Sequence, residues 1–145
     1  AMETRVVVCS GCGKRNRVAG DEERRVPVCG FCKTPLLKPG LTELNGAVFE
    51  RFLQGDPKPL LIDFYAPWCV PCRAMAPVLE ALAASHPELR VGKVNVDQEM
   101  GLAERYGVAS VPTLLFFREG RVEERQTGTL SLQALERLIQ EWGRK

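Results

Sequence analysis

The sequence predicts an α/β domain with a mixed central sheet flanked by helices, preceded by a small cysteine-rich module. Three observations lead to this prediction. Short apolar runs alternate with segments of helical periodicity along most of the chain. The last two predicted strands are joined by a tight turn, and such a hairpin makes the sheet mixed. The six cysteines form three Cys-x-x-Cys pairs, two of which lie close to the N-terminus.

The composition is that of an ordinary globular protein. The chain has 145 residues, of which 45% are hydrophobic and 26% are charged, enough for one domain and a small appendage. No apolar run is long enough to cross a bilayer, and the first residues lack the apolar core of a signal peptide. Cysteine pairs without a secretion signal are typical of metal binding or redox chemistry. We therefore expect a chain that stays in the cytoplasm.

The chain divides into two pieces of different character. Residues 1–37 are rich in Gly, Arg, Val and Cys, and we expect them to form a zinc-ribbon module in which strands at 6–8 and 25–28 lead into the cysteine pairs. A breaker cluster at 38–40 is the predicted linker. Residues 41–145 carry the helical and strand patterns and form the predicted main domain.

Periodicity predicts eight elements in the main domain, in the order α-β-α-β-α-β-β-α. Asn45 or Thr42 is the expected N-cap of the first helix. Proline inside the second helix, at Pro77, is expected to kink it. Helices are predicted over 44–53, 69–84, 100–106 and 132–142, and strands over 60–65, 91–96, 113–117 and 121–126.

The third cysteine pair lies where a buried strand gives way to a helix. The first turn of a helix carries unpaired N–H groups and the positive end of the macrodipole, so a thiolate at Cys69 is stabilised and becomes the attacking sulfur. Cys72 lies one turn further along, within reach of a disulfide, and is expected to be less exposed. A single pair can also be half of a zinc site, but no further cysteine follows to complete one.

Asp63 stands in the middle of the predicted apolar strand just before this pair. A carboxylate there is buried, and burial raises its pKa. This would suit Asp63 to take the proton from Cys72 when that thiol resolves a mixed disulfide. The alternative is a structural buried acid paired with a lysine such as Lys93.

Several motifs in the main domain resemble the thioredoxin family, and they occur in the family's order. They cover residues 41–145. The motifs are the active-site segment 64–73, the helix-kinking Pro77, the strand 93–97, the loop 106–113 with its proline, and the glycines Gly120 and Gly128.

The resemblance implies a thioredoxin fold with Cys69 as nucleophile, Cys72 as resolving thiol and Asp63 as proton acceptor. It also implies that Trp68, Val111 and Pro112 line a substrate groove and that the bond before Pro112 is cis. One position departs from the family, because Val70 stands where glycine is usual. Valine is stiffer than glycine and adds apolar surface beside the reactive sulfur, so we include it among the substrate-binding residues.

The two N-terminal pairs have the spacing of a zinc ribbon. Cys9, Cys12, Cys29 and Cys32 fit the C-x₂-C-x₁₅₋₂₀-C-x₂-C pattern, and each pair encloses a glycine that lets backbone N–H groups turn toward the sulfurs. Because a segment this short buries little apolar core, one structural Zn²⁺ would supply most of its folding energy. Thioredoxins of the thioredoxin-2 type carry a similar ribbon. Two structural disulfides, or a switch that releases zinc on oxidation, are the alternatives.

The expected activity is reduction of protein disulfides. By resemblance, the partners are oxidised protein substrates and an NADPH-dependent thioredoxin reductase, and no Gly-rich fingerprint suggests that this chain itself binds a nicotinamide or flavin. The alternative is a zinc-ribbon adaptor or redox-switched chaperone that uses the fold to bind partners. Residues 1–40 hold eight basic and four acidic side chains. Because four thiolates and one Zn²⁺ offset this excess, we do not expect nucleic acid to be a partner.

Overall fold

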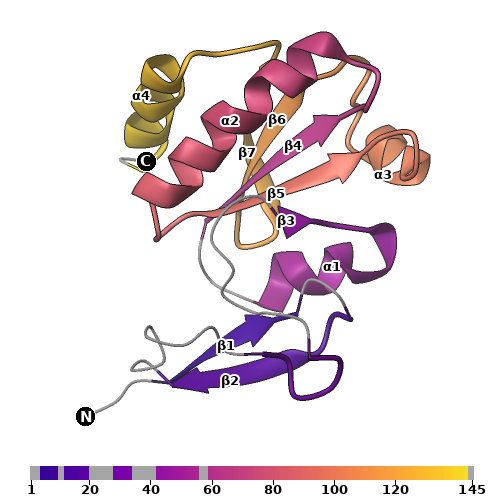
Figure 1. Cartoon of the computed structure of the whole chain (residues 1–145), viewed down its shortest axis with the longest axis vertical. Helices are drawn as coiled ribbons and strands as arrows, with labels where there is room; N and C mark the ends of the chain where they lie inside the picture. The colour runs from indigo at the N-terminus through magenta and orange to yellow at the C-terminus, as the bar shows by residue number, and fades with distance from the viewer. Residues whose placement is uncertain (1–3, 10–11, 20–27, 34–41, 56–58, 144–145) are drawn as a thin grey trace.

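The computed structural model describes residues 4–9, 12–19, 28–33, 42–55 and 59–143. It contains a two-stranded N-terminal hairpin and a five-stranded sheet covered by helices (Figure 1). The hairpin pairs β1 (Thr4–Val8) with β2 (Arg15–Ala19) in antiparallel fashion. β1 contains the predicted strand at 6–8, whereas β2 was not predicted, and most of the strand predicted at 25–28 lies outside the described residues, as does the linker at 38–40.

The central sheet is mixed, as predicted. Its strand order is β3-β5-β4-β6-β7, in which β3, β5 and β4 run parallel and β6 and β7 are antiparallel to their neighbours. The strand β3 has only two residues, too few to produce a periodicity in the sequence, and it was not predicted. The strands are β3 (Thr42–Glu43), β4 (Leu60–Tyr65), β5 (Arg90–Asn95), β6 (Thr113–Arg118) and β7 (Arg121–Thr127).

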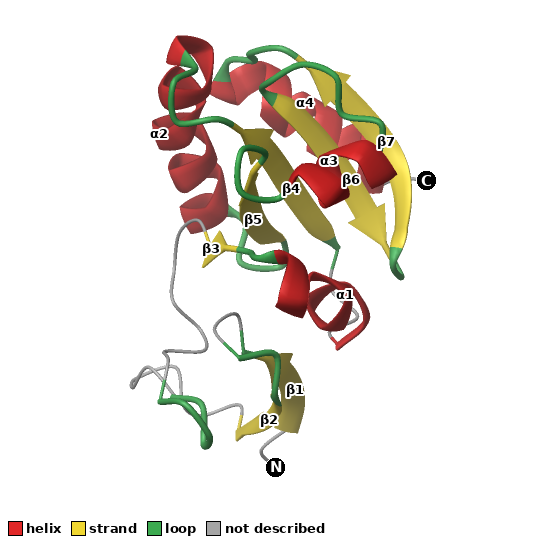
Figure 2. Cartoon of the chain, turned by 90° about the vertical axis from the view of Figure 1, so that its right-hand side faces the viewer, coloured by secondary structure: helices red, strands yellow, loops and turns green. Residues whose placement is uncertain are grey.

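Helices cover both faces of this sheet (Figures 1 and 2). All four lie where periodicity predicted them, and no end is displaced by more than two residues. None of the helices in the described part of the chain is long and apolar enough to span a bilayer. The helices are α1 (Gly46–Gly55), α2 (Val70–Ser85), α3 (Met100–Arg105) and α4 (Leu132–Gly143).

Strand β4 is apolar except for Asp63, because both of its faces are buried. Its alternate residues enter two separate cores, because successive side chains of a strand point to opposite faces. Ile62 and Phe64 pack with α1 and α3, whereas Leu61 packs with α2 and α4. Both faces are covered, so a polar residue such as Asp63 in this strand is taken out of water.

The N-terminal hairpin packs against α1, on the side of that helix away from the sheet (Figure 2). Val8 of β1 is buried and belongs to the same apolar core as Leu44 and Phe49. The hairpin therefore shares a core with the main domain.

Candidate active site and candidate metal centre

The third cysteine pair lies at the start of α2. Cys69 is the N-cap residue of this helix, and its sulfur accepts a hydrogen bond from the backbone N–H of Cys72 at 3.2 Å. Pro71 stands in the first turn, where its missing N–H leaves no helical hydrogen bond unmade. The sulfur of Cys69 thus lies at the positive end of the helix, as predicted.

Cys69 and Cys72 are joined by a disulfide, with their Cα atoms 5.2 Å apart. Both residues are 4% exposed, so the expected difference in burial between them is absent in this oxidised form. They belong to a small buried cluster with Ala66. Two exposed apolar side chains flank this cluster, Trp68 at 67% and Val70 at 65%.

A loop from a distant part of the chain lies beside the dithiol. The Cys69 sulfur is 3.8 Å from the carbonyl oxygen of Val111, and Val111 packs against the buried cysteine cluster. The peptide bond between Val111 and Pro112 is cis, which confirms what the family resemblance implied. Pro112 is buried and leads directly into β6. The structure therefore brings the predicted loop to the predicted pair.

Asp63 is 3% exposed and lies on the face of β4 that α2 covers. Within the described residues its Oδ1 atom has no hydrogen-bond partner. Burial raises the pKa of Asp63 to about 7; the nearby Lys93 ammonium opposes this rise, and the Glu43 carboxylate adds to it. A carboxyl group with this pKa can accept or release a proton near neutral pH.

Two neighbours of Asp63 were not identified from the sequence. Tyr65 donates a hydrogen bond from its hydroxyl to Glu43, and the Lys93 nitrogen lies 5.4 Å from the centre of the Tyr65 ring. Tyr65 is two residues from Asp63 on the same strand, so alternation alone could have placed the two on one face. No comparable signal marks Glu43, because it reaches this face only through the pairing of β3 with β5.

Comparison with known proteins agrees with this geometry. The family model described as Thioredoxin matches residues 40–141. The chain belongs to the thioredoxin family. Thioredoxin C-3 from Corynebacterium nephridii is 34% identical over 137 residues, which cover 94% of this chain and 92% of that protein. A thioredoxin from Alicyclobacillus acidocaldarius is 44% identical over 94 residues, covering 64% of this chain and 89% of the relative.

Solved thioredoxin structures are similar in fold. A mutant thioredoxin from Halobacterium salinarum aligns with a TM-score of 0.66 at 36% identity, over 71% of this chain and 90% of its own. The thioredoxin NaTrxh from Nicotiana alata aligns with the same TM-score at 28% identity, over 72% and 94%. The thioredoxin fold is therefore shown, and family membership makes this chain a thiol–disulfide oxidoreductase.

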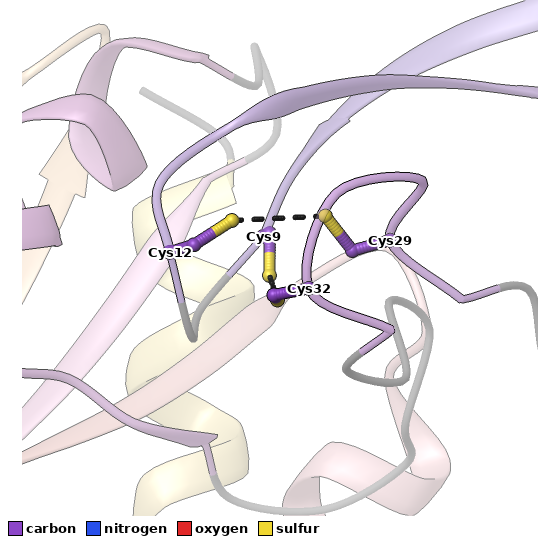
Figure 3. Close-up of side chains that lie close together, drawn as sticks. All are labelled: Cys9, Cys12, Cys29 and Cys32. Atoms are coloured by element: carbon purple, nitrogen blue, oxygen red, sulfur yellow. Dashed lines mark hydrogen bonds between the residues drawn. The ribbon is translucent and has the colours of Figure 1, made fainter.

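Outside residues 40–141, which the family model matches, four cysteines of the N-terminal region converge on one point (Figure 3). Their sulfur atoms all lie within 4.8 Å of one another, at 3.5 Å between Cys9 and Cys32 and 3.7 Å between Cys12 and Cys29. Four sulfurs placed tetrahedrally about 2.3 Å from a Zn²⁺ would be about 3.8 Å apart. The four thiols therefore fit a single metal ion.

Each N-terminal pair, or knuckle, is built around the same backbone turn. The N–H of Gly13 donates to the carbonyl of Cys9 at 2.8 Å, and the N–H of Lys33 donates to the carbonyl of Cys29 at 3.0 Å. Gly13 has φ 78° and Lys33 has φ 67°, so each turn ends in the left-handed region. Glycine takes the left-handed position after the first pair and Lys33 takes it after the second, whereas the sequence suggested glycines inside the pairs. Gly11 lies outside the described residues.

Asn16 of β2 holds the second knuckle, and it was not identified from the sequence. Its side chain donates to the Cys29 sulfur at 3.4 Å and accepts the N–H of Gly30 at 3.0 Å. The backbone N–H of Cys32, followed by the Asn16 side chain and the N–H of Phe31, lowers the pKa of the Cys29 thiol. These donors favour a thiolate, the form that binds a metal.

Proposed function

We propose that this thioredoxin reduces protein disulfides in the cytoplasm through the Cys69-Val70-Pro71-Cys72 dithiol. The observation that supports this most directly is the Cys69–Cys72 disulfide at the start of α2, with the Cys69 sulfur against a helical N–H and beside the Val111 carbonyl. A reversible disulfide at a helix N-terminus is suited to exchange. The cytoplasm is the compartment in which a dithiol of this kind is kept reduced.

In the proposed reaction the reduced protein starts with both thiols free. The Cys69 thiolate attacks one sulfur of a substrate disulfide, a Cys69–substrate bond forms, and the other substrate sulfur leaves as a thiolate that takes a proton from water. Cys72 then gives its proton to Asp63 and attacks the Cys69 sulfur. The mixed disulfide breaks, and the second substrate sulfur leaves as a thiolate. The substrate gains two electrons, and Cys69–Cys72 becomes the disulfide.

Asp63 is the proposed proton acceptor because it is buried on the face that α2 covers, and its pKa of about 7 makes it a base at neutral pH. Electrons would return to the dithiol from thioredoxin reductase, which supplies thioredoxins in general. The chain has no Gly-rich dinucleotide fingerprint, so we propose that it binds no nicotinamide or flavin of its own.

The proposed substrate groove consists of Trp68, Val70, Val111 and Pro112. The two exposed apolar side chains beside the buried sulfurs support it, because they offer contact area to a protein segment. An extended substrate segment would pair with the backbone of Val111, next to the Cys69 sulfur.

We further propose that Cys9, Cys12, Cys29 and Cys32 hold one structural Zn²⁺, in a chain of the thioredoxin-2 type. The proposed parts are a zinc ribbon over 1–37, a linker over 38–40 and the thioredoxin domain over 41–145. The sulfur spacing supports the metal, and the alignment with Thioredoxin C-3 is long enough to include the N-terminal cysteines. When bound, zinc would supply folding energy to a hairpin with little core of its own.

An insulin-reduction assay with thioredoxin reductase and NADPH tests the redox proposal. The wild-type protein should turn over, and Cys69→Ser should lower the rate by about 10³-fold or more, because no other sulfur can take its place. Cys72→Ser should accumulate a mixed disulfide visible by mass spectrometry. Partner binding that survives in Cys69→Ser while the wild type fails to reduce insulin would favour an adaptor and overturn the proposal.

A further inference from the structure

A row of charged side chains crosses the sheet next to the dithiol. Glu43 of β3 is the register partner of Lys93 of β5, and Lys93 is the register partner of Asp63 of β4. Register partners on neighbouring strands point to the same face of a sheet. The three side chains therefore share the face that α2 covers, with the acid Glu43 at the exposed edge and the acid Asp63 in the interior.

Tyr65 connects this row to the cysteines. It lies on the same face as Asp63, two residues further along β4, and packs against the buried cluster that contains Cys69 and Cys72. Its hydroxyl donates a hydrogen bond to Glu43, and the Lys93 ammonium lies over its ring. Glu43 thus reaches the surroundings of the active site although it lies on an edge strand.

We propose that Glu43 is a positioning residue for the proton acceptor. The Tyr65 hydroxyl holds the Glu43 carboxylate in place, and this negative charge partly offsets the attraction of the Lys93 ammonium for ionised Asp63. The inference depends on the proposed role of Asp63. Glu43 makes no contact with substrate in this proposal. It acts on Asp63 only through electrostatic interactions on one face of the sheet.

The charges around Asp63 give the direction of the effect. β5 contributes Lys93, β3 contributes Glu43 and β4 itself contributes Tyr65, while the β6 partner is the uncharged Leu114. α2, which covers this face, contributes the apolar side chains of Met75 and Leu79. Lys93 favours the ionised form of Asp63 and so weakens it as a base. Glu43 opposes this, which keeps Asp63 basic enough to deprotonate a thiol near neutral pH.

The first measurement is the titration of Asp63 in the reduced protein, followed by carboxyl ¹³C NMR. In Glu43→Gln the midpoint should fall by roughly half a pH unit or more, the size expected for one charge at this range in a partly screened site. In Lys93→Gln it should rise. The matched control is Glu104→Gln on the exposed surface of α3. The Asp63 midpoint in this variant should equal that of the wild type.

The second measurement is the rate at which Cys72 resolves a mixed disulfide with a peptide, as a function of pH. The acidic limb of this profile should move to lower pH in Glu43→Gln, in step with the NMR midpoint. Tyr65→Phe should move it in the same direction, and adding Glu43→Gln to Tyr65→Phe should give no larger movement than Glu43→Gln alone. Additive movements would contradict an anchoring role of the tyrosine hydroxyl and overturn the inference.

Asp63→Asn separates the two proposals. If this variant slows resolution and changes its profile while Glu43→Gln behaves like Glu104→Gln, the role of Asp63 stands and the inference about Glu43 is wrong. If Asp63→Asn leaves the rate and profile unchanged, the proton-acceptor proposal is wrong, and the inference about Glu43 is wrong with it. A downward movement in Glu43→Gln together with slow resolution in Asp63→Asn supports both.

Discussion

The dithiol at the start of α2 and the two N-terminal knuckles share one local turn but have different surroundings. In all three, the N–H four residues after the first cysteine donates to that cysteine's carbonyl: Arg73 to Cys69, Gly13 to Cys9 and Lys33 to Cys29. After Arg73 the chain continues as a helix, whereas Gly13 and Lys33 have positive φ and end the turn. The backbone conformation of the residue that ends the turn therefore distinguishes the dithiol from the two knuckles.

The sulfurs face different partners in the two kinds of site. The helix keeps Cys69 and Cys72 facing each other, so they form a disulfide that a substrate can exchange with. The left-handed turns send the chain onward, and each sulfur of one knuckle then faces a sulfur of the other, Cys9 toward Cys32 and Cys12 toward Cys29. Four mutually close thiols fit one metal ion, as proposed above, whereas two at a helix start form the redox pair.

Replacing cysteine with serine in each region should have the largest effect, because each site depends on its sulfurs. A Cys9→Ser, Cys29→Ser variant should lose zinc, from about one ion per chain to near none, and still reduce insulin. A Cys69→Ser, Cys72→Ser variant should keep zinc and lose insulin reduction by roughly 10³-fold or more. Metal analysis and the reductase-coupled assay on the same samples measure both. Loss of zinc in the second variant would contradict the separation of the two sites.

Asp63→Asn should stabilise the protein at high pH. The pKa of Asp63 is raised from its ordinary 3.8 to about 7, so the folded state binds the proton more tightly than the unfolded state, and folding is increasingly penalised as pH rises from 3.8 to about 7. The penalty is at most about 4 kcal/mol. We expect Asn to raise the free energy of unfolding by about 2–4 kcal/mol at pH 8 and by much less at pH 4.5.

Urea unfolding of wild type and Asp63→Asn at both pH values measures this difference. A loss of stability in Asp63→Asn that is larger at pH 8 than at pH 4.5 would mean that Lys93 holds Asp63 ionised. In that case Asp63 would be a structural buried acid paired with Lys93.

Val8→Ala tests the shared core of hairpin and main domain. Val8 is 2% exposed and belongs to the core under α1, so truncation should lower the free energy of unfolding by about 2 kcal/mol. Val6, at 39% exposure on the same strand, gives the control, and Val6→Ala should cost about 0.5 kcal/mol or less. Chemical unfolding followed by Trp142 fluorescence reports on the main domain. Equal effects from the two variants would show that the hairpin does not support that domain.

Lys33→Gly should have the smallest effect, a modest stabilisation of the second knuckle. Lys33 has φ 67°, a conformation that glycine adopts without strain, so we expect the knuckle to gain about 0.5–1 kcal/mol. Gly13→Ala at the equivalent position should have the opposite sign. Competition with a zinc chelator measures both, as a few-fold change in affinity. Weaker zinc binding in Lys33→Gly would show that the Lys33 side chain matters more than its backbone.

Much of the main domain was predictable because its signals are local. The strand at 60–65 was predicted to the residue, because a strand buried on both faces is a predominantly apolar run bounded by turn residues. α1 follows directly after Asn45, one of the two predicted caps. The strands β2 and β3 were missed because β2 has mainly polar residues and β3 is too short for alternation to show.

The fold class, the helix that presents Cys69 and the spacing of the N-terminal cysteines can all be recognised from the amino-acid sequence, because periodicity and motif spacing involve residues close along the chain. The side chains that surround Asp63 become visible only once the strands are paired. The row from Glu43 through Lys93 depends on the register of three parallel strands, and the approach of Val111 to Cys69 joins residues 42 positions apart. Such contacts leave no periodic trace in a sequence, because they arise from packing between segments that are distant along it.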